Sequence, residues 1–263
     1  MNIGMRRGTS RAIAAVVLTA GLGGAGTLAT TPEPAQATTS TAQAAIAVEV
    51  ALSVGTAAEA PAAKPVDCRR VKCVALTFDD GPGKYTDTLL RTLAAYDARA
   101  TFFVVGQNVA AYPGALRRTY AAGHEIGNHS WSHPDLTRLS AASVRSQFTR
   151  TDRAIKAAIG IRPKLVRPPY GAFDATVRRQ AGRPVVMWSV DTLDWRYRDS
   201  ARVARKAVKA VRPGSVILFH DIHPTTVRAI PKVLKALSKR GYRFVTVSRL
   251  FGGSPPRLVY SRG

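Results

Sequence analysis

The chain has 263 residues, and its 39 lysines and arginines outnumber its 16 aspartates and glutamates, which gives a formal net charge of +23. This length allows one large domain of roughly 200 residues and an additional N-terminal segment. The charge favours anionic partners such as wall polymers or acidic lipids, or else reflects a solvated basic surface without a dedicated partner. No recognised nucleic-acid-binding motif occurs, so we expect no nucleic-acid partner.

The N-terminal residues 1–37 have the pattern of a signal peptide. Three arginines precede residue 12, residues 12–29 are uncharged and small or apolar, and Ala35-Gln36-Ala37 offers a small-x-small cleavage site. A membrane anchor is the alternative, because the uncharged stretch is nearly long enough to span a bilayer. Its glycines, its threonines and its lack of bulky side chains favour the signal peptide. We therefore expect a secreted or cell-wall-associated protein.

Composition divides the rest of the chain into two parts. Residues 38–64 are rich in Ala, Thr, Pro and Val and are expected to form a flexible linker. Residues 65–263 are expected to form one folded domain. Its only cysteines, Cys68 and Cys73, are closely spaced, which in an exported protein indicates a disulfide. Two free thiols are the alternative, whereas a structural zinc ribbon would need a second cysteine pair.

From Cys73 onwards, short apolar and β-branched runs alternate with longer segments of helical period. The runs predicted as strands are Val74–Phe78, Thr101–Val105, His124–Ile126, Leu165–Arg167, Pro184–Val190, Ser215–Phe219 and Tyr242–Val247. Strands that alternate with helices indicate an α/β fold with a parallel sheet. About seven such units suit a closed or nearly closed, deformed (β/α) barrel. An open doubly wound sheet is the alternative, but no GxGxxG follows the first strand.

Two helices stand out between the strands. Ser140–Ile159 has Ser140 as its N-cap, apolar residues along one face and Gly160 as its stop. Thr226–Arg240 has a similar apolar face and ends before Gly241. Because Pro231 lies inside this second span, we expect the helix to begin there.

Unusual polar residues gather just beyond the predicted strand ends. The segments concerned are Asp79-Asp80, Asn128-His129, Pro168-Pro169-Tyr170, Asp191 with Asp194, and His220-Asp221. In a parallel barrel these ends converge on one face, where active sites are built. Loop polarity alone explains some of the carboxylates, but it does not explain the accompanying histidines and arginine.

His129 and His133 have the i, i+4 spacing that brings two imidazoles together on one helical turn, which suits a divalent transition metal. Pro134 indicates that this turn need not be a regular helix. A carboxylate from Asp79-Asp80 would complete a His-His-Asp set that suits metal-assisted hydrolysis. One of the two aspartates would ligate the metal, and the other would accept a proton from water. A plain Asp-Gly turn at residues 80–81 is the alternative.

Five segments in order carry a family resemblance: Thr77–Gly81, His129–His133, Arg167–Gly171, Asp191–Trp195 and Leu218–Asp221. They resemble the five motifs of the polysaccharide deacetylases, the NodB-homology or carbohydrate esterase family 4 proteins. The resemblance covers residues 71–250 and implies a deformed barrel and a divalent metal, Zn²⁺ or a similar ion such as Co²⁺. It identifies residues 65–263 as the catalytic domain.

The resemblance also implies a role for each site residue. The metal ligands would be Asp80, His129 and His133. Asp79 would be the general base, held ionised by Arg167, and His220 would be the general acid, paired with Asp194. The backbone N–H of Tyr170 would stabilise the oxyanion, and Trp195 and Leu218 would line the pocket for the acetyl methyl group. No motif position departs from the family pattern in a way that suggests an inactive enzyme.

The expected activity is hydrolysis of N-acetyl groups from N-acetylglucosamine residues of peptidoglycan, chitin or chitooligosaccharides, with release of acetate. An acetylxylan esterase that removes O-acetyl groups is the closest alternative, because the motifs do not separate the two. The basic charge favours peptidoglycan and its associated anionic polymers. A catalytically silent wall-binding module is a further alternative, but loss of Asp79 or His220 would have indicated it, and both are present. A lone metal-dependent phosphoesterase leaves the Arg-Pro-Pro-Tyr and His-Asp segments unexplained. We expect a monomer.

Overall fold

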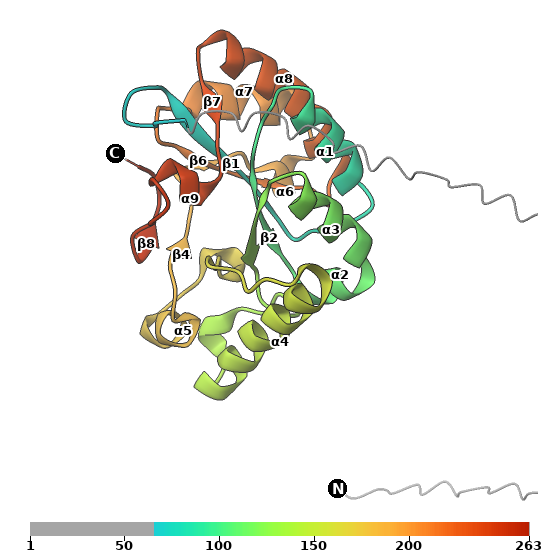
Figure 1. Ribbon diagram of the computed structural model, residues 1–263, viewed down its shortest axis with the longest axis vertical. Coiled ribbons are helices and arrows are strands. Elements are labelled where there is room, and N and C mark those ends of the chain that lie inside the picture. The colour runs from blue at the N-terminus through green and yellow to red at the C-terminus, as the bar shows by residue number, and fades with distance from the viewer. Residues whose placement is uncertain (1–65, 263) are drawn as a thin grey trace, which may run out of the picture. The chain divides into compact units, whose positions relative to one another are not determined.

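The computed structural model describes residues 66–262, so the expected signal peptide and linker lie outside the described residues. Helices surround a parallel sheet in this part of the chain (Figure 1). The strands are β1 (Cys73–Asp79), β2 (Thr101–Val104), β3 (Glu125–Asn128), β4 (Val185–Val186), β5 (Val190–Asp191), β6 (Val216–His220), β7 (Arg243–Phe244) and β8 (Leu258–Val259). The α-helices are α1 (Thr86–Ala94), α2 (Gly106–Ala111), α3 (Pro113–Ala121), α4 (Ala141–Ile159), α5 (Ala175–Ala181), α6 (Asp194–Tyr197), α7 (Ser200–Ala210), α8 (Pro224–Lys239) and α9 (Val247–Leu250), and two short 3₁₀ turns are η1 (Leu136–Arg138) and η2 (Pro169–Gly171).

The main sheet has the strand order β3-β2-β1-β6-β5, with β7 also paired to β1 and every ladder parallel. A second parallel pair joins β4 to β8. Val166 connects the two sheets through single bridges to Asn128 and Val185. The predicted parallel α/β architecture is therefore confirmed, and β8 was not expected. The predicted strand at 165–167 is reduced to these bridges.

The predicted strand 184–190 is two short strands, because the backbone changes its partner in the middle. The β4 end pairs with β8, whereas the Ser189 N–H already donates to Val216 O of β6 at 3.0 Å. Between them, the guanidinium of Arg167 occupies the carbonyls of Val186 and Met187. The side chain of Arg167 thus donates to the carbonyls that a ladder would use, and β4 and β5 pair with different strands, β8 and β6.

The side chains of β1 alternate between two environments, as a strand buried on both faces requires. Leu76 and Phe78 pack in the cluster beneath the surrounding helices, whereas Cys73 and Ala75 belong to a second cluster on the other face. Thr77 and Asp79 continue that second face and are buried polar residues. On this second face of β1, the side chains are therefore polar only at the C-terminal end of the strand.

Helix α4 agrees with its prediction, including the Ser140 Oγ that accepts from Ser143 N–H and the left-handed Gly160 that ends it. Helix α8 does not begin at Pro231, as predicted, but at Pro224, and it runs through Pro231. Pro224 occupies a first-turn position, where a proline costs no hydrogen bond. Burial of Val227 and Ile230 stabilises the turn ahead of Pro231 against the loss of one backbone hydrogen bond.

Cys68 and Cys73 are paired in the structure, with a Cα–Cα distance of 5.4 Å. The pair does not lie wholly before the first strand, because Cys73 is the first residue of β1. It is therefore at the end of β1 opposite to Asp79. Within residues 66–262, no helix is both long enough and apolar enough to cross a membrane.

Candidate active site

The parallel pairing of β1 with β6 brings two titratable groups side by side. Asp79 and His220 are register partners at the C-terminal ends of these strands. Residues opposite each other in adjacent strands project from the same face of a sheet. The pairing therefore places a carboxylate and an imidazole at one point, although they are far apart in the sequence.

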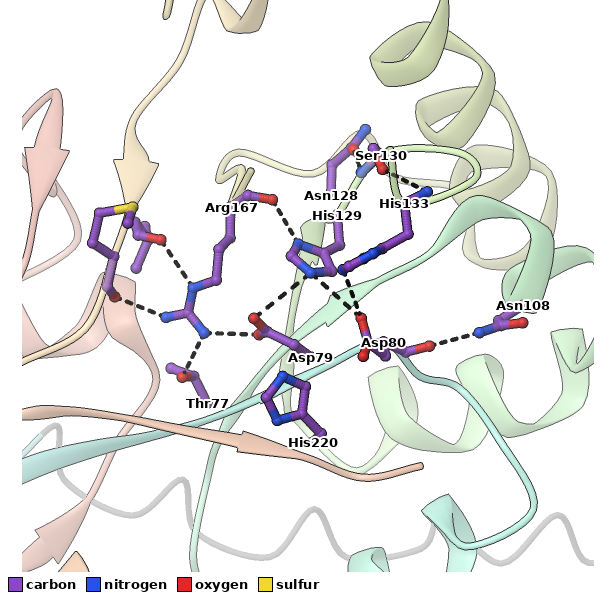
Figure 2. Close-up of polar contacts among 12 residues, drawn as sticks. Thr77, Asp79, Asp80, Asn108, Asn128, His129, Ser130, His133, Arg167 and His220 are labelled. Atoms are coloured by element: carbon purple, nitrogen blue, oxygen red, sulfur yellow. Dashed lines mark hydrogen bonds and ion pairs between the residues drawn. The ribbon is translucent and has the colours of Figure 1, made fainter. Parts of the chain in front are cut away.

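Asp80, His129 and His133 form a compact cluster beside this pair (Figure 2). Their ligand atoms all lie within 4.8 Å of one another. The Nε2 atoms of His129 and His133 lie 3.5 and 3.3 Å from Asp80 Oδ1. That oxygen is buried and has no hydrogen-bond partner among the described residues. An orphaned carboxylate oxygen that faces two imidazole nitrogens fits a divalent metal ion.

His129 is oriented by its other ring nitrogen, since Nδ1 lies 2.6 Å from Arg167 O. A proton on Nδ1 donates to that carbonyl and leaves the Nε2 lone pair free toward Asp80. Burial and the neighbouring His129 lower the pKa of His133, which keeps this ring neutral and able to ligate. The backbone of Asp80 is held by Asn108, whose Nδ2 donates to Asp80 O at 2.6 Å.

The segment 129–133 is a loop and not the helical turn that the spacing suggested. Ser130 and His133 have left-handed φ angles of 67° and 57°. Side chains hold this shape: Asn128 Oδ1 accepts from Ser130 N–H, and Ser130 Oγ accepts from His133 N–H at 3.1 Å. The two imidazoles still meet, with ring centroids 5.0 Å apart. The prediction was therefore right about the juxtaposition and wrong about its cause.

Arg167 is fully buried and fixes Asp79. Its Nη1 donates to Asp79 Oδ1 at 2.7 Å and to Thr77 Oγ1 at 2.8 Å. Burial lowers the pKa of Arg167, and the Asp79 carboxylate opposes that effect. Its guanidinium also lies 4.2 Å from the centre of the Phe103 ring. Each nitrogen of this buried guanidinium therefore makes at least one hydrogen bond, and the bond from Nη1 fixes the position of the Asp79 carboxylate.

His220 is held by Asp194 at the start of α6. Asp194 Oδ1 lies 2.9 Å from His220 Nδ1, and Thr226 Oγ1 donates to Asp194 Oδ2 at 2.8 Å. Burial by itself would lower the pKa of His220, but the hydrogen bond and the negative charge of Asp194 raise it to about 9, with smaller contributions from Asp79 and Asp80. Burial opposes ionisation of Asp194, yet its bonds to His220 and Thr226 leave its pKa below the ordinary value.

Asp79, His129, His133 and His220 line one cavity of about 390 Å³, and Asp80, Arg167 and Asp194 each contact one of these lining residues. Tyr170 and Trp195 stand at its exposed rim, with 70% and 47% of their surface accessible, and Leu218 lies on its wall. Tyr170 has a left-handed φ of 60° within η2, which is costly for a bulky residue. All the predicted site residues except the disulfide cysteines therefore gather around this cavity or directly support it.

Trp188 and Asp191 line the cavity but had no predicted role. Asp191 lay within a recognised motif, and Trp188 lay in a strand prediction whose interruption only the structure reveals. Asp221 also lay within a recognised motif and had no predicted role. It is fully buried, it accepts a hydrogen bond from Thr86 Oγ1, and its Oδ1 has no partner among the described residues. Burial raises the pKa of Asp221 to about 7, with a further contribution from the charge of Asp80.

A parallel α/β domain with a His-His-Asp cluster, a second carboxylate and an imidazole in one cavity has the donor set of a mononuclear metal hydrolase. The chain belongs to the polysaccharide deacetylase family, whose model matches residues 67–184. The peptidoglycan-N-acetylglucosamine deacetylase of Bacillus cereus is 41% identical over 66% of this chain and 68% of its own length.

Another relative and two solved structures are also similar to this chain. The peptidoglycan-N-acetylglucosamine deacetylase PgdA of Listeria monocytogenes is 42% identical over 69% of this chain, but the chain spans only 39% of that protein. The solved T48 deacetylase with substrate is 47% identical, with a TM-score of 0.72 over 74% of this chain and 99% of its own. An acetyl xylan esterase from Clostridium thermocellum, solved with a cobalt ion, is 35% identical, with a TM-score of 0.69 over 72% and 98% of the two chains.

Proposed function

We propose that the chain is a metal-dependent polysaccharide deacetylase that hydrolyses the N-acetyl groups of N-acetylglucosamine residues and releases acetate. The observation that carries this proposal is that Asp79, His220 and the two histidines of the Asp80–His129–His133 cluster line one cavity. Amide hydrolysis needs a polarised carbonyl, a base for the attacking water and an acid for the leaving nitrogen. This cavity offers a group for each requirement.

Asp80, His129 and His133 would hold the metal. When bound, a divalent ion such as Zn²⁺ or Co²⁺ supplies Lewis-acid polarisation of the acetyl carbonyl and activation of water. Two imidazoles and one carboxylate suit both ions. Three protein ligands leave coordination positions open, as a catalytic site requires.

Asp79 would act as the general base. It is buried beside the cluster, with its Oδ2 3.7 Å from His129 Nε2, and it is joined to Arg167 through its other oxygen. Arg167 therefore occupies one oxygen and leaves the second free to accept a proton from the attacking water. The ion pair also fixes the direction in which that free oxygen points.

His220 would act as the general acid. Its Nδ1 is committed to Asp194, so its Nε2 is the nitrogen left to donate a proton to the departing amine. The C–N bond breaks only when its nitrogen is protonated, because a free amide anion is too basic a leaving group. Proton transfer from His220 Nε2 completes the reaction and leaves acetate and a free amino sugar.

Tyr170 and two apolar residues would position the substrate. The strained backbone at Tyr170 supports a role for its N–H as a donor to the developing oxyanion. Trp195 and Leu218 line the cavity and provide apolar surface for the acetyl methyl group. The exposed ring of Tyr170 offers a surface on which a sugar ring can lie.

The substrate we favour is peptidoglycan, because the two curated relatives described above carry that name and the chain has a strong positive charge. Chitin-type oligosaccharides share the same N-acetylglucosamine unit. An acetylxylan esterase is the second candidate, supported by the likeness to the Clostridium enzyme. A silent wall-binding module is disfavoured, since Asp79 and His220 are both present. We also propose that the protein is secreted or wall-associated and acts as a monomer.

Acetate release by purified protein on peptidoglycan, chitin oligomers and acetylxylan in parallel tests the proposal. We expect release from the two N-acetylated substrates, loss of release after chelation, and recovery when Zn²⁺ or Co²⁺ is returned. Release from acetylxylan alone would replace the N-deacetylase assignment with the esterase. No release from any of the three by metal-loaded protein would refute both.

A further inference from the structure

A second hollow, of about 280 Å³, lies between α5 and the segment that precedes β8. Its lining residues are Ala175, Arg178, Arg179, Arg183, Val185 and Arg257. Figure 1 shows α5 and β8 on the same side of the domain, well away from α7 and α8. None of these residues lines the catalytic cavity. Val185 precedes Trp188 by three positions, which in extended chain corresponds to roughly 10 Å.

The hollow has a surplus of positive charge. Four of its lining residues are arginines, and no aspartate or glutamate is among them. Among the ion pairs of the described residues, only Arg183 of these four takes part, through Asp152. Asp152 also forms an ion pair with Arg162, so its single negative charge is paired with two guanidiniums. The nearest carboxylate along α5, Asp174, accepts from Val177 N–H as the helix cap.

Arg183 is pre-positioned at the base of this hollow. Its Nη1 donates to Pro163 O and its Nη2 to Asp152 Oδ1, both at 2.8 Å. Its Nε is buried without a hydrogen-bond partner among the described residues. Leaving a charged donor buried and unsatisfied is unfavourable, and so is bringing like charges together. An anion in the hollow offsets the second cost, the repulsion among the four guanidiniums, whereas the Nε of Arg183 is closed off from solvent and is not counted as a donor to that anion.

We infer that this hollow, lined by Arg178, Arg179, Arg183 and Arg257, is an oxyanion-binding site. Guanidinium groups bind phosphate and carboxylate oxygens through paired N–H donors, and several from different segments can surround one anionic group. The ligand class is an anionic wall polymer that presents phosphate or carboxylate groups. This identity of the polymer rests on the proposed function, whereas the anion site itself does not. Bound there, the polymer would be retained while its acetylated sugars reach the catalytic cavity.

The test compares three variants of the full chain with the parent protein. In the first, Arg178→Gln, Arg179→Gln and Arg257→Gln are combined, and Arg183 is kept because its bonds support the fold. The second carries Arg→Lys at the same three positions, which preserves charge but removes the fork of donors. The control combines Arg205→Gln, Arg228→Gln and Lys232→Gln, three exposed cations on α7 and α8 that make no ion pair within the described part.

Binding is measured by co-sedimentation with purified cell walls and by titration with inorganic phosphate and with citrate, at about 0.15 M salt, where unspecific attraction is largely screened. We expect the Gln variant to bind walls roughly 10-fold more weakly, the Lys variant to be weakened several-fold, and the control to change by less than about 2-fold. Walls stripped of their phosphodiester polymers distinguish the two anionic groups. If binding to stripped walls is lost, the ligand is a phosphate group. If binding is retained and still depends on the arginines, the ligand is a carboxylate group.

Equal losses in the Gln variant and the control would overturn the inference, because they would show attraction by net charge alone. Full binding by the Lys variant would overturn it as well. Acetate release from a soluble chitooligosaccharide should be the same in all three variants and the parent. Because binding is measured without turnover, it tests the arginine site even if the proposed deacetylase activity fails.

Discussion

Asp194 holds His220 at two points, through the ring Nδ1 at 2.9 Å and through the backbone N–H, which donates to Asp194 Oδ2 at 2.7 Å. One carboxylate therefore fixes both the position of the imidazole and the nitrogen that faces the cavity. Its charge also stabilises the imidazolium, so that the raised pKa of about 9 keeps His220 protonated at neutral pH. That contribution to stability is fully present below the ordinary histidine pKa and is lost as pH rises through about 9.

Replacing Asp194 with asparagine should move the basic limb of the pH–rate profile to lower pH. The substitution removes the charge that raises the pKa of His220, and burial then favours the neutral ring. The measurement is kcat/KM against pH on a chitooligosaccharide, with Thr226→Val as a control that removes a hydrogen bond but no charge. A metal ion in the site lowers the pKa of His220 in the parent protein and in Asp194→Asn alike, so the difference between the two profiles is the quantity to compare. An unchanged basic limb in Asp194→Asn would contradict the assignment of His220 as acid.

His220→Ala should impair amide cleavage more than ester cleavage. Loss of a general acid costs about 10²–10⁴-fold when the leaving group must be protonated, and less when it leaves readily. Rates on a chitooligosaccharide and on an activated acetate ester measure the two effects. His223→Ala removes a neighbouring imidazole, 5.8 Å away between ring centroids, and should leave the ratio of the two rates unaltered. Equal losses on both substrates in His220→Ala would show that this histidine is not the acid.

Asp79→Asn should retain the metal and lose about 10²–10⁴-fold in rate, because the amide cannot accept a proton. It also leaves the buried Arg167 without its counter-charge, which on measured precedents for buried pairs costs about 3–5 kcal/mol of stability. Metal content, the free energy of unfolding and kcat are therefore measured together. A folded, metal-loaded Asp79→Asn protein with normal activity and normal pH dependence would exclude Asp79 as the base.

Removal of either imidazole from the metal cluster should reduce metal affinity sharply. His129→Ala and His133→Ala each leave two protein ligands, and His129→Ala also leaves the carbonyl of Arg167 without its partner. Titration of the apoprotein with Zn²⁺ or Co²⁺ provides the readout independently of activity. The matched control is His223→Ala, which removes a histidine outside the cluster. Stoichiometric metal at parental affinity in His129→Ala would rule out this ligand set.

Gly81→Ala should destabilise the protein because of Asp221. A Cβ atom on Gly81 would overlap the Asp221 carboxylate, which Thr86 holds in place. The clash should cost about 1–3 kcal/mol, and it should be relieved in part when Asp221 is also changed to alanine. Urea unfolding of the two single variants and the double variant measures the coupling. If the change in the free energy of unfolding of the double variant equals the sum of the changes in the two single variants, Gly81 and Asp221 do not contact each other in this way.

Local patterns predicted the elements that depend on local chemistry. Helix α4 was predicted with its cap, because Ser140 and Gly160 act on the residues next to them. Helix α8 was misjudged, because the packing that supports the turn before Pro231 comes from distant parts of the fold. The division of 184–190 was missed for the same reason, since it depends on carbonyls taken by Arg167.

The site was predictable to the extent that strand ends and motif order determine it. Asp79 and His220 were expected on one face because both follow strands, and the β1–β6 register confirms that they are partners. Asp221 lay in a recognised motif, but its contact with Thr86 had no periodic or compositional signal, because it joins residues 135 positions apart. The arginine hollow was equally hidden, since Arg257 reaches α5 only through the pairing of β8 with β4.

The pairing of β1 with β6 also has a consequence for synthesis of the chain. Thr77 Oγ1 donates to Ile217 O, a partner 140 residues later, and β1 lies at the centre of the sheet. Until residues beyond 216 have emerged, one edge of the apolar strand CVALTFD has no partner, which makes a nascent or truncated chain prone to aggregation. Such long-range pairing also slows folding. A chain that ends before β6 should therefore be insoluble, and the addition of β6 to β1 should also be the step that creates the catalytic pair.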